Sequence, residues 1–401
     1  MKTYSQTALE KDLNMKEKIS KNVRQIVPSV IREMSLRAAR YREVISLGIG
    51  EPDFHTPPPI CRAALVDAEN GATHYTPTRG DDELVTALQE YLLRDRGLDL
   101  DQSNIIVTHG GMGGLTAGLR ALLDPGDEAI VPEPCFPSYT PQIELANAVS
   151  VHVPTDFDDG FVVQAGRLES TVTPKTKLML INSPNNPTGA VITGEVLDEL
   201  ARIAVEKNLI VISDEVYDHL VYNGTHDSIY TRPGMAERTL VVNSFSKTFA
   251  MTGWRTGFSF GPSWLIEEML KVAMFFTSCP SSIGQRAGLA ALNTDRQVFA
   301  AMENEFETRC KFAWERLKAM PGIRINPASG SFYLFPSIAA ITEDDTSFAM
   351  DLLDEEQVVV VPGSAFGPSG AGCIRISCTV GTSLLSEALD RIEGFIHRRM
   401  H

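Results

Sequence analysis

Residues Thr239–Phe249 read Thr-Leu-Val-Val-Asn-Ser-Phe-Ser-Lys-Thr-Phe, an apolar run followed by two serines and a lysine. The run Thr239–Val242 is typical of a strand buried on both faces, so Lys247 is expected just past a strand end. Arg255 follows eight residues later. An amine placed this way is a usual means of binding an aldehyde cofactor as a Schiff base, and hydroxyls with a guanidinium suit a phosphate group. The stretch therefore predicts a strand-end cofactor site at Lys247.

Short apolar runs of the same kind recur between Asn104 and Gly261, and amphipathic stretches typical of helices separate them. The runs are Asn104–Thr108, Glu128–Val131, Leu178–Asn182, Leu209–Ser213, Leu240–Asn243 and Gly257–Phe260, and two of the helices are Leu115–Leu123 and Gly194–Lys207. Such alternation predicts an α/β fold with a mostly parallel sheet and helices on both faces. Ligands of these sheets bind outside the carboxyl ends of the strands, so polar residues at those ends are the site candidates.

A second region follows from about Asp295. The pattern predicts a helix over Arg296–Met320, ended by Pro-Gly, and then strands over Phe332–Phe335, Val358–Val361 and Cys373–Ser377. We expect a large cofactor-binding domain over residues 57–290 and a smaller α+β domain over residues 291–401. Residues 1–56 are expected to form an N-terminal arm and part of the small domain.

The composition narrows the classes of function. The net charge of −15 over 401 residues argues against a nucleic-acid partner. No apolar run approaches the ~18–20 residues that span a membrane. Six scattered cysteines show neither metal-ligand nor disulfide spacing, so no metal site is expected. The polar segment Met1–Lys21 lacks the apolar core of a secretory signal, and we expect a cytoplasmic protein.

Asp214 directly follows the predicted strand Leu209–Ser213. A carboxylate there can pair with a pyridinium nitrogen and keep it protonated. The phenol of Tyr217, three residues later, suits a hydrogen bond to a ring oxygen. Taken singly, a strand-end Asp is more often a cap or turn residue, and a Tyr is more often a core residue.

The motif Ser-Pro-Asn-Asn-Pro-Thr-Gly at Ser183–Gly189 follows the strand Leu178–Asn182. Its simplest interpretation is a turn rich in proline and glycine. A functional interpretation is that the prolines fix the carboxamide of Asn186, which can donate a hydrogen bond to the phenolate oxygen of the same ring.

The glycines Gly110–Gly114 lie between a predicted strand and the helix expected from Leu115. We expect a turn whose backbone approaches a phosphate, next to the N–H groups of the helix N-terminus. The spacing fits neither the dinucleotide-binding fingerprint nor the P-loop. Together with Ser244, Ser246 and Arg255, this turn predicts a phosphate site. With Lys247, Asp214 and the motif of Asn186 at other strand ends of the same unit, the sequence predicts a pyridoxal 5'-phosphate enzyme.

These motifs resemble the class I and II pyridoxal-phosphate aminotransferases of fold type I, in particular the bacterial aspartate/aromatic-type enzymes. The landmarks of the resemblance are Leu47–Phe54, Tyr75–Pro77 with Gly80, Asn185–Gly189, Asp214–Tyr217, Ser244–Lys247, Gly253–Gly257 and Arg375–Ser377. They extend over nearly the whole chain.

The resemblance implies a role for single residues. Lys247 is the Schiff-base lysine and proton shuttle, Asp214 is the partner of the pyridinium nitrogen, and Arg375 binds the substrate α-carboxylate. The other implied contacts are Phe136, Asn186 and Tyr217 at the cofactor ring, Gly111, Met112, Ser244, Ser246 and Arg255 at its phosphate, and Gly50 and Asn186 at the substrate. Tyr75 is implied to reach the phosphate of a neighbouring subunit, and hence a homodimer with shared active sites.

The implied reaction is a ping-pong transamination, in which an L-amino acid gives its amino group to a 2-oxo acid through the Schiff base of Lys247. A β-eliminating C–S lyase on the same fold is the alternative enzyme. A ligand-sensing regulator is the alternative of another class. Met112 and Gly113 depart from the family pattern, so the contact of this turn with the phosphate is expected from the backbone only. The substrate stays open, because no second arginine is clearly placed for a side-chain carboxylate. Arg32 and Arg37 are the candidates for binding a second substrate carboxylate.

Overall fold

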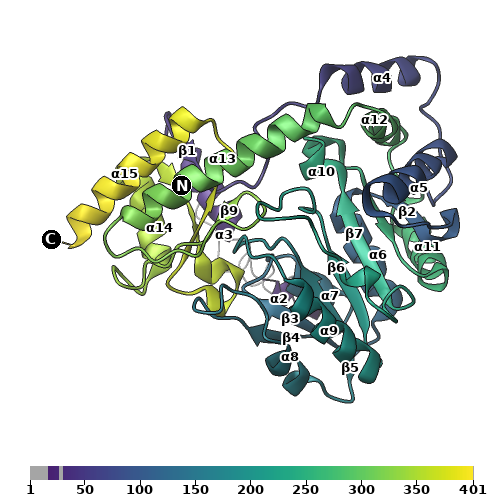
Figure 1. The fold of residues 1–401 in the computed structure, drawn as a ribbon, viewed down its shortest axis with the longest axis horizontal. Coiled ribbons are helices and arrows are strands. Elements are labelled where there is room, and N and C mark those ends of the chain that lie inside the picture. The colour runs from purple at the N-terminus through teal and green to yellow at the C-terminus, as the bar shows by residue number, and fades with distance from the viewer. Residues whose placement is uncertain (1–16, 27–29, 401) are drawn as a thin grey trace, which may run out of the picture.

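The computed structural model describes residues 17–26 and 30–400 (Figure 1). Its largest sheet has seven strands in the order β2-β8-β7-β6-β5-β3-β4. The strands are β2 (Ile105–Thr108), β3 (Glu128–Glu133), β4 (Val149–Pro154), β5 (Thr176–Asn182), β6 (Ile210–Asp214), β7 (Thr239–Ser244) and β8 (Gly257–Phe260). The pairs are parallel except those of β8, which runs antiparallel to β2 and β7. The predicted α/β fold with a mostly parallel sheet is confirmed.

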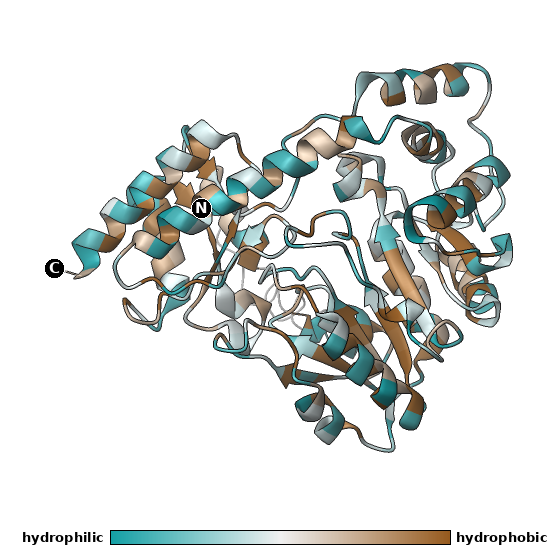
Figure 2. Cartoon of the chain, viewed as in Figure 1, coloured by the Kyte–Doolittle hydropathy of each residue, from teal (hydrophilic) through white to brown (hydrophobic). Residues whose placement is uncertain are grey.

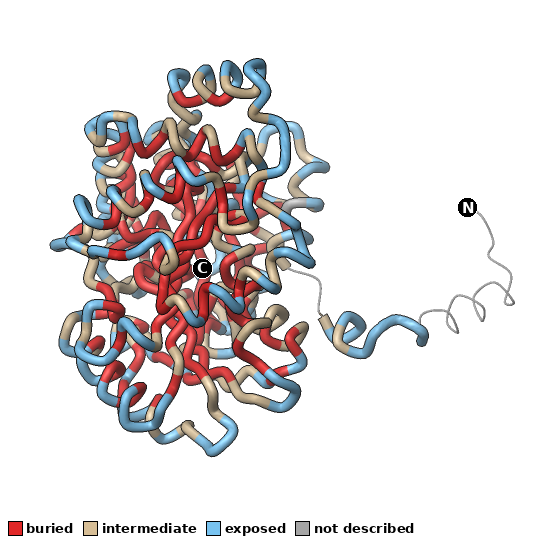
Figure 3. The backbone as a smooth tube through the Cα atoms, turned by 90° about the vertical axis from the view of Figure 1, so that its right-hand side faces the viewer, coloured by how far each residue is buried: buried red, intermediate tan, exposed pale blue. Residues whose placement is uncertain are grey.

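Helices cover both faces of this sheet. The elements around it are α4 (Pro58–Glu69), α5 (Asp82–Arg96), α6 (Gly110–Leu122), α7 (Tyr139–Leu145), α8 (Ala165–Thr171), α9 (Gly194–Glu206), α10 (Phe245–Thr248), α11 (Ser263–Thr277) and α12 (Ser282–Leu292), with the 3-10 turns η1 (Gln102–Asn104), η2 (Ile229–Thr231) and η3 (Thr252–Trp254). In β5, Leu178 and Leu180 pack in the core shared with α6 and α11, whereas Met179 and Ile181 pack in the core shared with α9. Strands apolar on both faces therefore form the buried centre, as the hydropathy and burial colours show (Figures 2 and 3).

The edge strand β4 was not predicted. Only Val153 of its six residues is buried, and His152 and Pro154 interrupt the apolar pattern. An edge strand needs only one apolar face, so its signal in the sequence is weaker than that of a central strand.

The glycines Gly110–Gly114 belong to α6 itself, so the expectation of a turn there and of a helix beginning at Leu115 was wrong. A Cβ atom on Gly114 would collide with Ser259 of β8, and one on Gly118 with Leu240 of β7. Small residues let α6 lie close to the sheet. This packing outweighs the low helix propensity of glycine, about 1 kcal/mol per residue relative to alanine.

A second group of elements is built from both ends of the chain (Figure 1). β1 (Ile45–Ser46) pairs in parallel with β10 (Val358–Val359), and β11 (Val361–Pro362), β12 (Ile374–Ser377) and β9 (Tyr333–Leu334) form an antiparallel sheet in that order. The helices are α3 (Val30–Ala38), α13 (Gln297–Ala319), α14 (Asp345–Glu356) and α15 (Thr382–Met400), with the 3-10 turns η4 (Gly363–Phe366) and η5 (Pro368–Gly370). The short helix α2 (Lys21–Gln25) lies instead against α7 of the large sheet region. Met34, Ile45 and Leu47 share an apolar core with residues of α13, α14 and α15.

The strand predicted over Val358–Val361 is divided between β10 and β11, which pair in different sheets. The division of the chain into residues 1–56, 57–290 and 291–401 stays a prediction. Its first part, and the interpretation of Met1–Lys21, include residues that lie outside the described ranges. Among the described helices, none combines the length and apolar character needed to cross a membrane.

Candidate active site

A cavity of about 320 Å³ lies at the carboxyl ends of β5, β6 and β7, where Tyr333 of β9 and Arg375 of β12 also line it. Twelve of the predicted site residues line this cavity: Gly50, Gly111, Met112, Phe136, Asn186, Asp214, Tyr217, Ser244, Ser246, Lys247, Arg255 and Arg375. Because the parallel strands end at one edge of the sheet, residues from distant parts of the chain meet there.

Lys247 lies on α10, directly after β7. Its Nζ donates a 2.6 Å hydrogen bond to the carbonyl oxygen of Gly50. Burial lowers the pKa of Lys247 to about 8, while the carboxylate of Glu51 acts in the opposite direction. Such an amine loses its proton more readily than a surface lysine and is a better nucleophile near neutral pH.

Asp214 is the last residue of β6 and is 5% exposed. Its Oδ2 accepts a 2.7 Å hydrogen bond from the hydroxyl of Tyr139, and its Oδ1 accepts one of 3.3 Å from the backbone N–H of Val216. Burial raises the pKa of Asp214 to about 6, and these two hydrogen bonds limit the rise. Sequence analysis missed Tyr139. The available signal was its spacing of three residues from Phe136, whose ring packs edge-to-face on it at 5.5 Å.

Groups that bind anions gather at the start of α6. Gly110 has a φ of +64°, and a Cβ atom there would lie 2.6 Å from Nη2 of Arg255. Nη1 of Arg255 donates to the carbonyl oxygen of Thr252 at 2.8 Å, and Ser244 Oγ donates to Ser246 Oγ at 2.9 Å. Together with the first N–H groups of α6, the guanidinium and hydroxyls form a site suited to a phosphate group.

Arg375 is 3% exposed and has neutral hydrogen-bond partners. Its Nη1 donates to Asn186 Oδ1 at 2.9 Å and its Nη2 to Gly48 O at 2.6 Å, whereas its buried Nε has no partner among the residues that the structure describes. The ring centroids of Tyr333 and Phe366 lie 4.4 and 4.9 Å from its guanidinium carbon. Burial lowers the pKa of Arg375. Within the described residues no carboxylate pairs with this cation, so it suits an anionic ligand.

Two further cavity residues were missed by the sequence analysis. The hydroxyl of Tyr333 lies 3.2 Å from that of Tyr217. Asn182, at the end of β5, donates to the carbonyl oxygen of Asp214 and accepts from the N–H of Asn186, both at 2.9 Å. Asn182 therefore ties the strand end that carries Asp214 to the turn that carries Asn186. Neither residue stands out in the sequence, because each also suits an ordinary strand position.

Three residues named from the sequence lie away from the cavity. Tyr75 is 90% exposed. Arg37 forms a salt bridge with Asp354, and Arg32 is exposed. Neither arginine lines the cavity, so the described residues give no support to either as the group that binds a second carboxylate.

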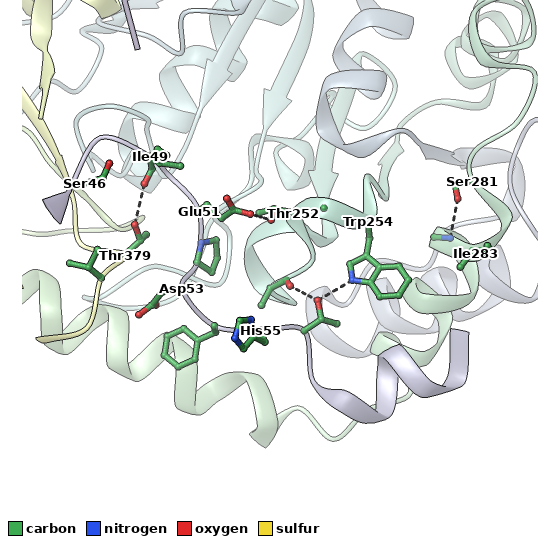
Figure 4. A pocket seen from close by; sticks show the side chains of 17 residues that line it. Ser46, Ile49, Glu51, Asp53, His55, Thr252, Trp254, Ser281, Ile283 and Thr379 are labelled. Carbon is green, nitrogen blue, oxygen red and sulfur yellow. Dashed lines mark hydrogen bonds between the residues drawn. The ribbon is translucent and has the colours of Figure 1, made fainter. Parts of the chain in front are cut away.

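A wider hollow of about 850 Å³ adjoins the cavity and shares Ile49 and Thr252 with it (Figure 4). The carboxylate of Glu51 points toward Thr252 and accepts a hydrogen bond from its hydroxyl. Asp53 is paired with Arg309 at 2.8 Å. This hollow therefore carries two carboxyl groups, one hydrogen-bonded to Thr252 and one paired with Arg309.

The residues of the cavity fit pyridoxal 5'-phosphate. The phosphate dianion matches Arg255 and the N-terminus of α6, the ring nitrogen matches the buried carboxyl of Asp214, and the aldehyde matches Lys247. The Nε of Arg375, unpaired within the described part of the chain, suits the carboxylate of a ligand. The fold and the cavity thus define an α/β enzyme that uses this cofactor on compounds with a carboxylate.

Comparison with known proteins agrees with this class. Residues 42–392 match the family described as aminotransferase class I and II. The chain is 44% identical over 376 residues to an aspartate aminotransferase of Pyrococcus abyssi, covering 93% of this chain and 96% of that protein. It is 42% identical over 385 residues to aromatic-amino-acid aminotransferase 2 of Thermococcus litoralis, covering 95% and 99%. The structure of the Thermus thermophilus aspartate aminotransferase with maleate has a TM-score of 0.89 at 38% identity, covering 94% of this chain and 99% of that one.

The chain belongs to the class I and II aminotransferases, a family of pyridoxal-phosphate-dependent enzymes. Its fold is that of fold type I, and its reaction is transamination between amino acids and 2-oxo acids. These relatives carry aminotransferase names, so the C–S lyase alternative is not favoured.

Proposed function

We propose that the cavity described above is where the chain moves the amino group of an L-amino acid to a 2-oxo acid, with Lys247 and Arg375 acting on the substrate. When bound, pyridoxal 5'-phosphate supplies an aldehyde for the amino group and a ring that withdraws electrons from the α-carbon. The observation that carries this proposal is that one short segment holds both side chains. Gly48 O accepts from Arg375 and Gly50 O accepts from Lys247, which brings a carboxylate-binding group and a base to one place.

Each group then has a distinct role. Lys247 holds the cofactor between turnovers, and its Nζ moves a proton at the substrate α-carbon. Asp214 keeps a proton on the ring nitrogen, because a buried carboxylate is stabilised by an adjacent cation. Asn186 and Tyr217 bind the ring oxygen, and Phe136 covers one face of the ring.

The remaining cavity residues bind the phosphate and the substrate. Arg375 binds the α-carboxylate with its free N–H groups, and Asn186 and the backbone of Gly50 lie beside the substrate. The phosphate site consists of Arg255, Ser244, Ser246 and the backbone N–H groups of Gly111 and Met112.

The substitution Lys247→Ala tests the central role. We expect turnover to fall by about 10²–10⁴-fold, with loss of the visible absorbance of the covalently bound cofactor. Borohydride reduction of the wild-type holoenzyme and peptide mapping should place the cofactor on Lys247. The exposed Lys271→Ala is the control and should behave as wild type. A Lys247→Ala enzyme with normal turnover would contradict the proposal.

We also propose a homodimer in which Tyr75 completes the phosphate site of the partner subunit. Tyr75 is 90% exposed, and Phe275 and Phe276 nearby in the fold are 86% and 58% exposed. The two segments adjoin, since Thr78 and Phe276 line one small cavity. Large apolar side chains so exposed are typical of an interface.

Subunit mixing tests this arrangement. Lys247→Ala and Tyr75→Ala chains are each expected to be impaired. If Tyr75 acts on the partner's site, a mixed dimer contains one intact site, and activity returns on mixing. If Tyr75 acts on its own site, no mixed dimer has an intact site. Light scattering at the assay concentration checks that the chain is a dimer.

Two finer points complete the proposal. The substrate range is to be determined from half-reaction spectra with aspartate, glutamate, alanine and aromatic amino acids, because relatives named for both aspartate and aromatic substrates are similar to this chain.

A cytoplasmic location suits the six cysteines, all of which are free thiols. Cell fractionation with an antibody to the chain tests that location.

A further inference from the structure

A loop of the small sheet region, residues 363–373, joins β11 to β12 and reaches the large sheet. It contains η4 and η5. Asp345, at the start of α14, is 3% exposed and holds both ends of the loop. Its carboxylate accepts hydrogen bonds from the N–H and the hydroxyl of Ser364 at 2.9 and 2.7 Å, and from the N–H of Gly372 at 3.2 Å. The two ends of the loop are therefore held by their own region of the fold.

The middle of the loop is held by Glu133, the last residue of β3. Glu133 is 5% exposed, and its Oε1 accepts hydrogen bonds from both the N–H and the hydroxyl of Ser369, at 2.9 and 2.8 Å. Its Oε2 lies 3.3 Å from Nδ1 of His152. Gly367 packs directly on the carboxyl group, because a Cβ atom there would collide with it. Charge-assisted hydrogen bonds in a buried place make this a strong link between the two sheets.

The same loop supports Arg375. The carbonyl oxygen of Phe366 accepts a 3.0 Å hydrogen bond from the N–H of Cys135, and the Phe366 ring lies 4.9 Å from the guanidinium carbon of Arg375. Phe136, next in the chain, lines the cavity. The segment after β3 therefore touches the support of the substrate-binding arginine and carries the ring expected on the cofactor.

We propose that Glu133 is a positioning residue for transamination. By holding Ser369 it fixes Phe366, and through that ring it sets the place of the Arg375 guanidinium relative to the cofactor. The inference rests on the proposed role of Arg375 in binding the substrate carboxylate. The distance between reacting groups matters steeply, since a misplacement of about 1 Å costs on the order of 100-fold in rate.

Four variants of the holoenzyme test this role. Glu133→Ala removes both acceptors, Glu133→Gln keeps an amide oxygen that accepts from Ser369, and Ser369→Ala removes one of the two donors. Glu128→Ala is the matched control, because Glu128 begins the same strand and instead accepts from Thr173 and Thr176. The binding probe is 3-phenylpropionate, a carboxylate without an amino group, and the affinity for pyridoxal 5'-phosphate is measured in parallel.

We expect Glu133→Ala to weaken binding of the probe and to lower kcat/KM by about 10–100-fold, while the affinity for the cofactor and the spectrum of the bound cofactor stay as in the wild type. Glu133→Gln should recover most of the loss, and Glu128→Ala should show none. A merely structural role predicts a lower unfolding midpoint with equal losses for probe and cofactor, and that result would overturn the proposal.

A double-mutant cycle with Arg375→Lys separates the two proposals. If Glu133 acts through Arg375, Glu133→Ala adds little to the loss already caused by Arg375→Lys, whereas additive losses would refute the positioning role. If Arg375→Lys alone leaves binding of the probe unchanged, the proposed role of Arg375 fails first. If Glu133→Ala does not fold, Ser369→Ala takes its place in the same cycle. In the wild-type background Ser369→Ala should lower the affinity for the probe a few-fold, and in the Arg375→Lys background it should cause no further loss.

Discussion

The hydroxyl of Tyr139 donates a 2.7 Å hydrogen bond to Oδ2 of Asp214, and both side chains are buried. The bond joins the start of α7 to the end of β6. Burial raises the pKa of Asp214 to about 6, and a hydrogen bond to the charged form works against this rise. Tyr139 therefore helps to keep the carboxylate ionised near neutral pH, which is the state that the proposed pairing with a protonated ring nitrogen requires.

Replacing Tyr139 with Phe should raise the pKa of Asp214 further and weaken cofactor binding. In the wild type we expect the affinity for pyridoxal 5'-phosphate to fall as the pH drops through about 6, where Asp214 gains its proton. In Tyr139→Phe this fall should move to higher pH. Equilibrium dialysis across the pH range measures it. Tyr230→Phe, another buried tyrosine but outside the cavity, is the control, and coincident profiles for Tyr139→Phe and wild type would count against this role.

The cofactor-free enzyme should become more stable on replacing Asp214 with Asn. The pKa of Asp214 is raised from 3.8 to about 6, so the ionised form is the unfavourable one in the fold. The cost grows as the pH rises from about 4 to 6, and above pH 6 it is about 3 kcal/mol at 1.36 kcal/mol per pH unit. Asp214→Asn has no charge to bury, so its free energy of unfolding should exceed the wild-type value at pH 8 and match it at pH 4.

Urea unfolding of the cofactor-free proteins at both pH values measures this difference. The same variant should bind the cofactor poorly, since its amide cannot neutralise the ring nitrogen. Asp227→Asn is the opposite control. Arg232 holds the pKa of Asp227 below its usual range, which means that the ionised carboxylate of Asp227 stabilises the fold. Removing this carboxylate should therefore destabilise the protein at pH 8. If Asp214→Asn is less stable than the wild type at pH 8, burial of the ionised carboxylate does not destabilise the fold.

Gly110→Ala should impair phosphate binding. The new Cβ atom would lie 2.6 Å from Nη2 of Arg255 and would displace the guanidinium. The matched control is Gly160→Ala, because Gly160 has a φ of +65° against +64° for Gly110, and nothing lies within 4 Å of its Cβ position. Both variants bear a backbone cost of about 1–2 kcal/mol. Only Gly110→Ala should lose affinity for pyridoxal 5'-phosphate and for inorganic phosphate, as measured by titration calorimetry. Equal affinities in the two variants would contradict this account.

Lys247 should react with an acylating reagent at lower pH than other lysines in the cofactor-free protein. Its pKa is lowered to about 8 by burial, whereas the carboxylate of Asp127 raises the pKa of Lys177. The rate of labelling at Lys247, followed by mass spectrometry, should rise through about pH 8, and that at Lys177 only at higher pH. Because Glu51 raises the pKa of Lys247, Glu51→Gln should shift the Lys247 profile to lower pH. Labelling of both lysines over the same pH range would disprove the effect of burial.

Much of the site follows from local sequence pattern. Lys247, Asp214 and Asn186 each stand at or just after an apolar run, and strands buried on both faces have a strong signal because every residue is apolar. Parallel strands end at one edge of a sheet, so residues at several strand ends must meet once the sheet forms. The candidate groups for the cofactor and the base were therefore readable from local pattern, whereas Arg375, the candidate for the substrate carboxylate, was named from the family resemblance.

The partners of those residues depend on packing between distant parts of the chain. Tyr139 bonds to Asp214, and Ser369 bonds to Glu133, only because the register of the strands and the position of the small sheet against the large one bring these residues together. The helix at Gly110–Gly114 likewise forms against local propensity, since close contact with β7 and β8 favours residues without a side chain. Local composition specifies which groups reach the edge of the sheet, whereas long-range contacts set their protonation and their distances.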